Sequence, residues 1–93
     1  METPYSLDAA RIEPEREKWI IGSVVDLLDK NGPLGVRQIV QMNAKKGISE
    51  AEGAIILTKL RLEGITSINS EFVVDFRADY GTIKAWLIKN NIK

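Results

Sequence analysis

The sequence predicts a mostly α-helical domain that contains one small β-hairpin. Apolar residues recur at helical spacing in several segments, and residues that favour helix ends stand at the borders of these segments. Two short stretches rich in β-branched and aromatic residues follow one another around residue 70. Because 93 residues can bury only one modest core, we expect a single domain over residues 14–93, preceded by an N-terminal arm over residues 1–13.

The first expected helix begins near Pro14 and stops at Asn31-Gly32-Pro33. Proline suits a first helical turn, and a glycine followed by proline ends a helix. We expect Trp19 to pack in the core because it belongs to a broad apolar face. The other members of that face are Ile20, Ile21, Val24, Val25, Leu27 and Leu28.

Two further helices are expected in the middle of the chain. Leu34-Gly35 reads as a short connector that can pair as an edge strand, and the residues from Val36 to Lys45 have helical spacing. Ser49 and Glu52 form a capping-box pattern at the start of the third helix. That helix is expected to end at Glu63-Gly64, with Gly64 in the left-handed conformation.

A hairpin and a last helix complete the expected elements. The strands are Ile65 to Asn69 and Phe72 to Phe76, joined by a polar turn at Ser70-Glu71. Asp79 can cap a final helix that runs to about Asn90. The apolar side of this helix is wider than a small surface helix needs, and it consists of Ile83, Trp86, Leu87 and Ile88.

The composition excludes several classes of protein. The chain has no cysteine and no histidine, which removes disulfides, thiol chemistry, Cys/His zinc sites and imidazole catalysis. Its carboxylates are scattered and it has no phosphate-binding glycine loop, so we expect neither an enzyme nor a cofactor. No apolar run approaches the roughly 20 residues of a membrane span and no signal pattern opens the chain, so we expect a cytoplasmic protein without a membrane partner.

The order of elements resembles the winged-helix superfamily from about Glu15 to Phe76. The resemblance is carried by the stretches LLDKNGPLGVRQIV, GIS and LTKLRLEGI. In that family a leucine pair like Leu57 and Leu60 packs the third helix on the first two, and a pair like Gly64-Ile65 starts the wing. The resemblance implies a winged helix-turn-helix with an additional C-terminal helix. It leaves the ligand open, because the same scaffold serves DNA-binding proteins and protein-interaction modules.

The third helix is expected to carry apolar residues on two opposite sides. The expected core side holds Gly53, Ile56, Leu57, Leu60 and Gly64. The outer side, which winged-helix proteins turn toward the DNA major groove, holds Ile48, Ala51, Ile55, Thr58 and Leu62.

Three explanations of the apolar outer side stay open. The helix can be buried on both sides by the N-terminal arm, the last helix or a second subunit. It can instead present an exposed stripe that docks a partner protein, or it can contact thymine methyl groups.

The charged residues give mixed indications about whether the chain binds nucleic acid. The formal net charge is +0, whereas DNA-binding proteins usually carry a basic excess. Glu50 at the helix start and Glu71 at the hairpin tip would both repel phosphates. The candidate DNA-contacting residues are Arg37, Lys45, Lys46, Thr58, Lys59 and Arg61.

Two functional hypotheses follow. The first is a small winged-helix protein that binds double-stranded DNA, as a transcriptional regulator or a replication-associated factor, which is what the resemblance implies. The second is a protein-interaction module that uses the outer side of the third helix, with Ala51, Ile55 and Leu62 as contacts. A homodimer is a further hypothesis, in which Trp86 lies either in the interface or in the core.

Overall fold

The computed structural model describes residues 12–92. Over this range the chain is mostly helical, with four helices and a small antiparallel sheet of three strands. The elements follow in the order α1 (Pro14–Asn31), β1 (Leu34–Gly35), α2 (Val36–Ala44), α3 (Glu50–Leu62), β2 (Thr66–Ile68), β3 (Val73–Phe76) and α4 (Tyr80–Lys89). Residues 1–11 of the predicted N-terminal arm lie outside the described residues. Ile12, which also belongs to the predicted arm, packs against the core.

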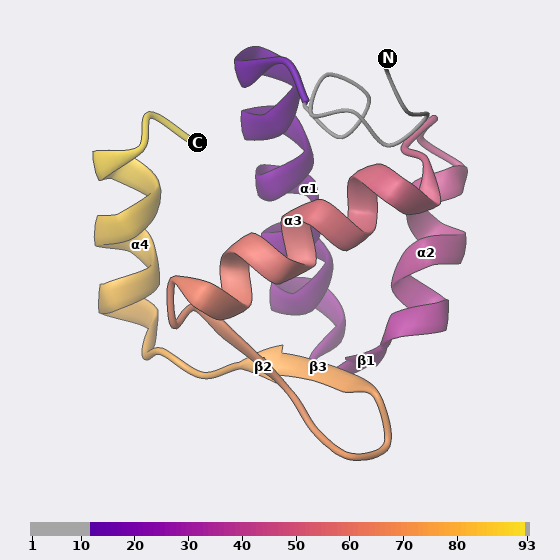
Figure 1. The fold of residues 1–93 in the computed structure, drawn as a ribbon. Coiled ribbons are helices and arrows are strands. Elements are labelled where there is room, and N and C mark those ends of the chain that lie inside the picture. The colour runs from indigo at the N-terminus through magenta and orange to yellow at the C-terminus, as the bar shows by residue number, and fades with distance from the viewer. Residues whose placement is uncertain (1–11, 93) are drawn as a thin grey trace, which may run out of the picture.

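Helix α3 is the central element of the arrangement (Figure 1). It crosses in front of α1 and contacts both α1 and α2. Helices α2 and α4 stand on either side of it, and the strands lie beneath the helices. The core contains the predicted residues Ile56, Leu57 and Leu60 of α3, which pack with residues of α1 such as Ile20 and Val24.

The sheet has the strand order β1-β3-β2. β2 and β3 form the predicted hairpin, with Ile68 opposite Val74. The predicted edge strand is also confirmed, since Leu34 of β1 pairs with the same Val74 from the other side. The sheet therefore ties the segment before α2 to the hairpin that follows α3.

The ends of the helices confirm the local sequence signals. Ser49 Oγ accepts a hydrogen bond from the Glu52 backbone N–H at 3.1 Å, and the Glu52 side chain accepts one from the Ser49 N–H at 2.9 Å. Gly64 has φ +79°, the left-handed conformation that glycine adopts without strain. Asp79 caps α4 by accepting from the Thr82 N–H at 2.7 Å.

None of the helices in the described part of the chain combines the length and the apolar character that a membrane crossing requires.

Candidate functional site

The outer side of α3 is mainly a surface of small side chains. Ala51, Ala54 and Thr58 are exposed, and Ile55 between them is half-buried. Leu62 is 77% exposed, but it is the last residue of the helix. The predicted apolar stripe is therefore interrupted by Thr58, and its most exposed member lies at one end.

The prediction that Ile48 lies on this outer side is wrong. Its side chain is only 2% exposed and belongs to the core. Ile48 precedes the helix, and its backbone N–H donates to the carbonyl of Asn43 at 3.0 Å, directly after Gly47 at φ +81°. Because the chain is in a turn here, the angular spacing of a helix does not apply to this residue.

Arg16 of α1 fixes the beginning of α3. Its Nε lies 2.6 Å from Glu52 Oε2, and its Nη2 donates to Glu52 Oε1 at 3.0 Å and to the Gly47 carbonyl at 2.8 Å. The bonds from Arg16, together with the backbone bond to Ser49, lower the pKa of Glu52 to about 2. Glu52 is thus a structural residue that joins α1 to the cap of α3.

Two of the predicted DNA-contacting lysines interact with side chains of α1. Lys59 Nζ lies 2.9 Å from Glu17 Oε2, and both side chains are partly buried. Lys46 Nζ donates to Ser23 Oγ at 2.6 Å. A phosphate would have to compete with these partners, so both lysines are weaker candidates than their sequence positions indicate.

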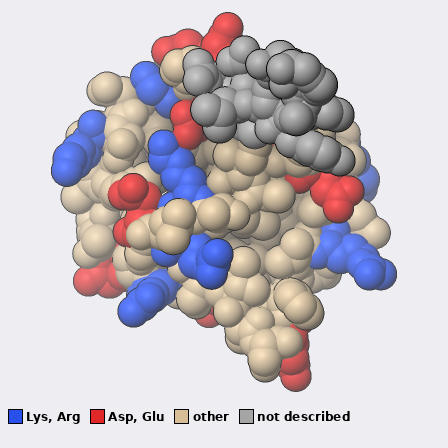
Figure 2. Space-filling model, in the orientation of Figure 1, with Lys and Arg blue, Asp and Glu red and all other residues tan. Residues whose placement is uncertain are grey.

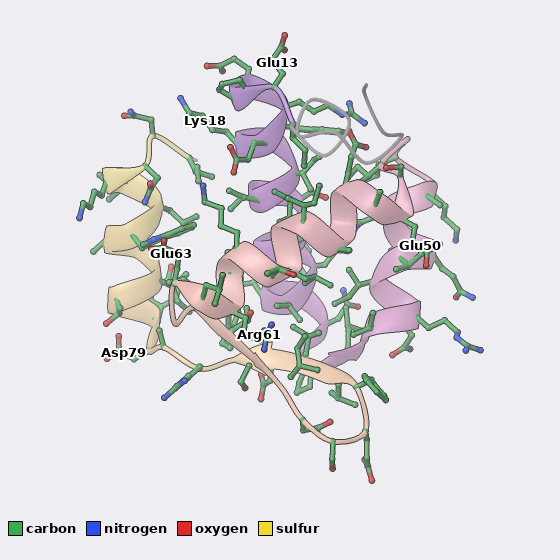
Figure 3. All side chains as sticks on the ribbon, in the orientation of Figure 1. Glu13, Lys18, Glu50, Arg61, Glu63 and Asp79 are labelled. Carbon is green, nitrogen blue, oxygen red and sulfur yellow. The ribbon has the colours of Figure 1, made fainter. Side chains whose placement is uncertain are left out.

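Three other predicted DNA-contacting cations are more accessible to a phosphate group. Arg37 and Lys45 of the α2 region and Arg61 of α3 are all exposed, and none of them forms an ion pair with another residue of the range 12–92. Figure 3 shows Arg61 toward the end of α3 that is distant from α2, and Glu50 at the α2 end. In Figure 2 separate cationic groups stand on both sides of a largely uncharged area over α3.

The hairpin loop presents an aromatic residue that sequence reasoning missed. Phe72 is 71% exposed and has φ +60°, which is unusual for a residue with a bulky side chain. Asn69 Oδ1 holds the loop by accepting from the N–H groups of Glu71 at 2.8 Å and Val73 at 3.0 Å. The Phe72 carbonyl in turn accepts from the Val36 N–H at 2.9 Å, which anchors the loop to the start of α2.

A shallow groove connects this loop to the helices. Its volume is about 340 Å³, and Phe72 forms one side of it. Arg37 and Glu50 both line the groove, so a cation and a carboxylate from different helices face the same space. Val36 and Val40 supply the remaining apolar lining.

The two tryptophans are less buried than a core position requires. Trp19 was expected in the core, but it is 48% exposed and lies beneath the Arg16 guanidinium, whose central carbon is 5.5 Å from the ring centre. The core takes the neighbouring Ile20 and Ile21 instead. Trp86 is half-buried, and its Nε1 donates to Glu63 Oε1 at 3.1 Å, which joins α4 to the end of α3.

Within the range 12–92 the acidic side chains form no cluster that could hold a metal ion. Comparison of the chain with protein-family models, with characterised proteins and with solved structures gives no match.

Proposed function

We propose that this chain is a small winged-helix protein that binds double-stranded DNA through α2, α3 and the hairpin loop. The order of helices and strands supports this proposal, as does the position of β1 beside β3. One observation carries it. Arg37, Lys45 and Arg61 are exposed without ion-pair partners in the described chain, and the exposed side of α3 carries mainly small side chains.

In this proposal the cations contact phosphates and α3 approaches the bases. Small side chains such as Ala51 and Ala54 would let the helix backbone come close to the groove floor, and their methyl groups suit thymine. Thr58 is the exposed hydrogen-bonding residue at the middle of this side. A protein with this role would work as a transcriptional regulator or a replication factor in the cytoplasm.

Two carboxylates oppose phosphate binding. Glu50 stands at the first turn of α3 and Glu71 in the hairpin loop, and both are exposed. With three available cations against two acids, we expect weak binding that depends strongly on charge. Lys46 and Lys59 contribute only if they leave Ser23 and Glu17.

A series of charge variants tests the proposal by titration of a fluorescent duplex at low salt. Arg37→Ala, Lys45→Ala and Arg61→Ala should each weaken binding and reduce the salt slope by about one unit. Glu50→Gln should strengthen binding by about two- to fivefold, because it removes a repelling charge. The matched control is Lys84→Ala with Lys89→Ala, two exposed lysines of α4. Equal effects of the α2–α3 variants and the α4 control would refute the proposed surface.

A second candidate function is the docking of a partner protein. The observation in its favour is the exposure of two large apolar residues, Leu62 and Phe72, at opposite ends of the same surface. Under this hypothesis Leu62→Ser and Phe72→Ser abolish capture of a partner and leave duplex affinity unchanged. Ala51 and Ile55 would lie between the two anchors.

The hypothesis of a homodimer concerns α4. Ile88 is exposed there and Trp86 is half-buried, so the predicted wide apolar side is only partly covered in one chain. Sedimentation equilibrium of the wild type and of Ile88→Ser would show whether this side joins two copies.

A further inference from the structure

A second candidate site lies between α1, the end of β3 and α4. It is a cavity of about 420 Å³, which is within the range of roughly 300–1,000 Å³ that is usual for small-molecule sites. The described lining residues come from neither α2 nor α3, so the cavity is separate from the proposed DNA surface. Its apolar lining consists of Val25, Phe76, Ala78, Ile83 and Leu87.

The polar lining of the cavity is asymmetric in charge. Asp26 and Asp29 of α1 lie one helical turn apart, and the cation on the lining is Lys84 of α4. Lys84 Nζ lies over the Tyr80 ring at 5.4 Å from its centre. Asp26 is paired with Lys30 at 3.2 Å, whereas Asp29 has no ion-pair partner among residues 12–92.

We propose that this cavity binds a small organic cation, namely a primary amine with an apolar body. The body would occupy the space between Val25, Ile83 and Leu87, and the ammonium group would lie at Asp29. The Tyr80 ring in the same lining already carries the Lys84 ammonium group, so Asp29 is the residue that attracts the ligand cation. An anionic ligand would meet two carboxylates for one ammonium group, which makes it a poorer fit. This proposal does not depend on DNA binding.

The test uses 2-phenylethylamine as the probe and follows the backbone amide signals of the protein by NMR. The expected result is saturable shifts at Gly22, Asp29 and Ile83, with a Kd in the millimolar range, since a ligand of this size makes few contacts. The neutral 2-phenylethanol should bind about fivefold more weakly, because it lacks the charge that Asp29 attracts. Phenylacetate should bind most weakly.

Variants distinguish binding at this site from nonspecific binding of the probe elsewhere on the protein. Asp29→Asn should reduce the affinity for the amine to that for the alcohol, and Ala78→Leu should abolish binding of both by filling the cavity. Glu71→Gln in the hairpin loop is the matched control and should change neither affinity. Equal binding of amine and alcohol, an unchanged affinity in Asp29→Asn, or no shifts around the cavity would each overturn the proposal. If Ala78→Leu does not fold, the comparison of the amine with the alcohol and the affinity of Asp29→Asn for the amine still test the proposed site.

Discussion

At the residue scale, the side chain of Arg16 connects parts of the chain that are distant in sequence. Its guanidinium bonds to Glu52 of the α3 capping box and to the turn carbonyl of Gly47, and it covers Trp19. The sequence predicted the cap, because Ser49 and Glu52 are only three residues apart. It could not predict Arg16 as a partner, because an ion pair across 36 positions depends on how the helices pack.

The Arg16–Glu52 pair predicts a pH dependence of stability. The folded-state pKa of Glu52 is lowered from 4.5 to about 2, so its stabilising effect is complete above the unfolded pKa and is lost as the pH falls from about 5 toward 2. We expect Glu52→Gln to lower the free energy of unfolding at pH 7 by about 1–2 kcal/mol. This is less than the free energy that corresponds to the whole pKa shift, because the Arg16 side chain is 39% exposed and solvent screens the pair.

Urea denaturation from pH 7 to pH 2 measures this effect. The difference between the wild type and Glu52→Gln should shrink as the pH falls. Glu15→Gln is the control, because Glu15 is exposed and contacts only Lys18, at 3.5 Å, in the ion pairs of the described chain. A difference that stays constant over this range would contradict the assigned role.

Asn43 provides a second prediction at this scale. Its side chain is 1% exposed and has no hydrogen-bonding partner within residues 12–92. An unpaired buried amide costs about 1–3 kcal/mol, which offsets the packing that its atoms provide. We therefore expect Asn43→Ala to change stability by less than about 1 kcal/mol, whereas Ile39→Ala, one turn earlier in α2, should cost about 2–5 kcal/mol.

Thermal unfolding of both variants compares them directly. A loss for Asn43→Ala as large as that for Ile39→Ala would show that the amide is paired in solution.

At the element scale, local signals predicted the helices and their ends well. Caps and glycine turns act over a few residues, so Ser49, Gly64 and Asp79 could each be assigned without knowledge of the fold. The burial of single residues was less predictable. Trp19 lies at the edge of a broad apolar face, and periodicity does not indicate which edge a neighbouring helix will cover.

Loss of the N-cap of α3 and loss of the N-cap of α4 should destabilise different portions of the domain. α3 contacts α1, α2 and β2, so its cap contributes to the stability of the whole domain. α4 lies at the periphery, and Ile83 is its one buried residue. We expect Ser49→Ala to cost about 1 kcal/mol of global stability, and Asp79→Ala to cost a similar amount within α4 alone.

Hydrogen exchange separates these outcomes. Asp79→Ala should accelerate exchange in α4 only, while Ser49→Ala should accelerate it in α1, α2 and α3 together. Faster exchange throughout the domain in Asp79→Ala would show that α4 is part of the cooperative core.

At the scale of the whole molecule, the prediction of a mostly α-helical domain with a small β-hairpin is confirmed, and β1 extends the hairpin to a sheet of three strands. The pattern of charges could be predicted only in part. Sequence position placed Lys46 and Lys59 near the third helix, but α1 supplies partners for both through Ser23 and Glu17. The available charge is therefore smaller than the composition of the region indicates, and the proposed DNA surface depends on three cations.

The salt dependence of duplex binding tests this proposal most directly. For three phosphate contacts the plot of log affinity against log salt concentration should be linear with a slope of about −3. Binding should disappear in the triple variant Arg37→Ala, Lys45→Ala, Arg61→Ala and persist in the α4 control. A wild-type protein that binds no duplex even at low salt, or binds with an affinity independent of salt, would contradict the proposed function.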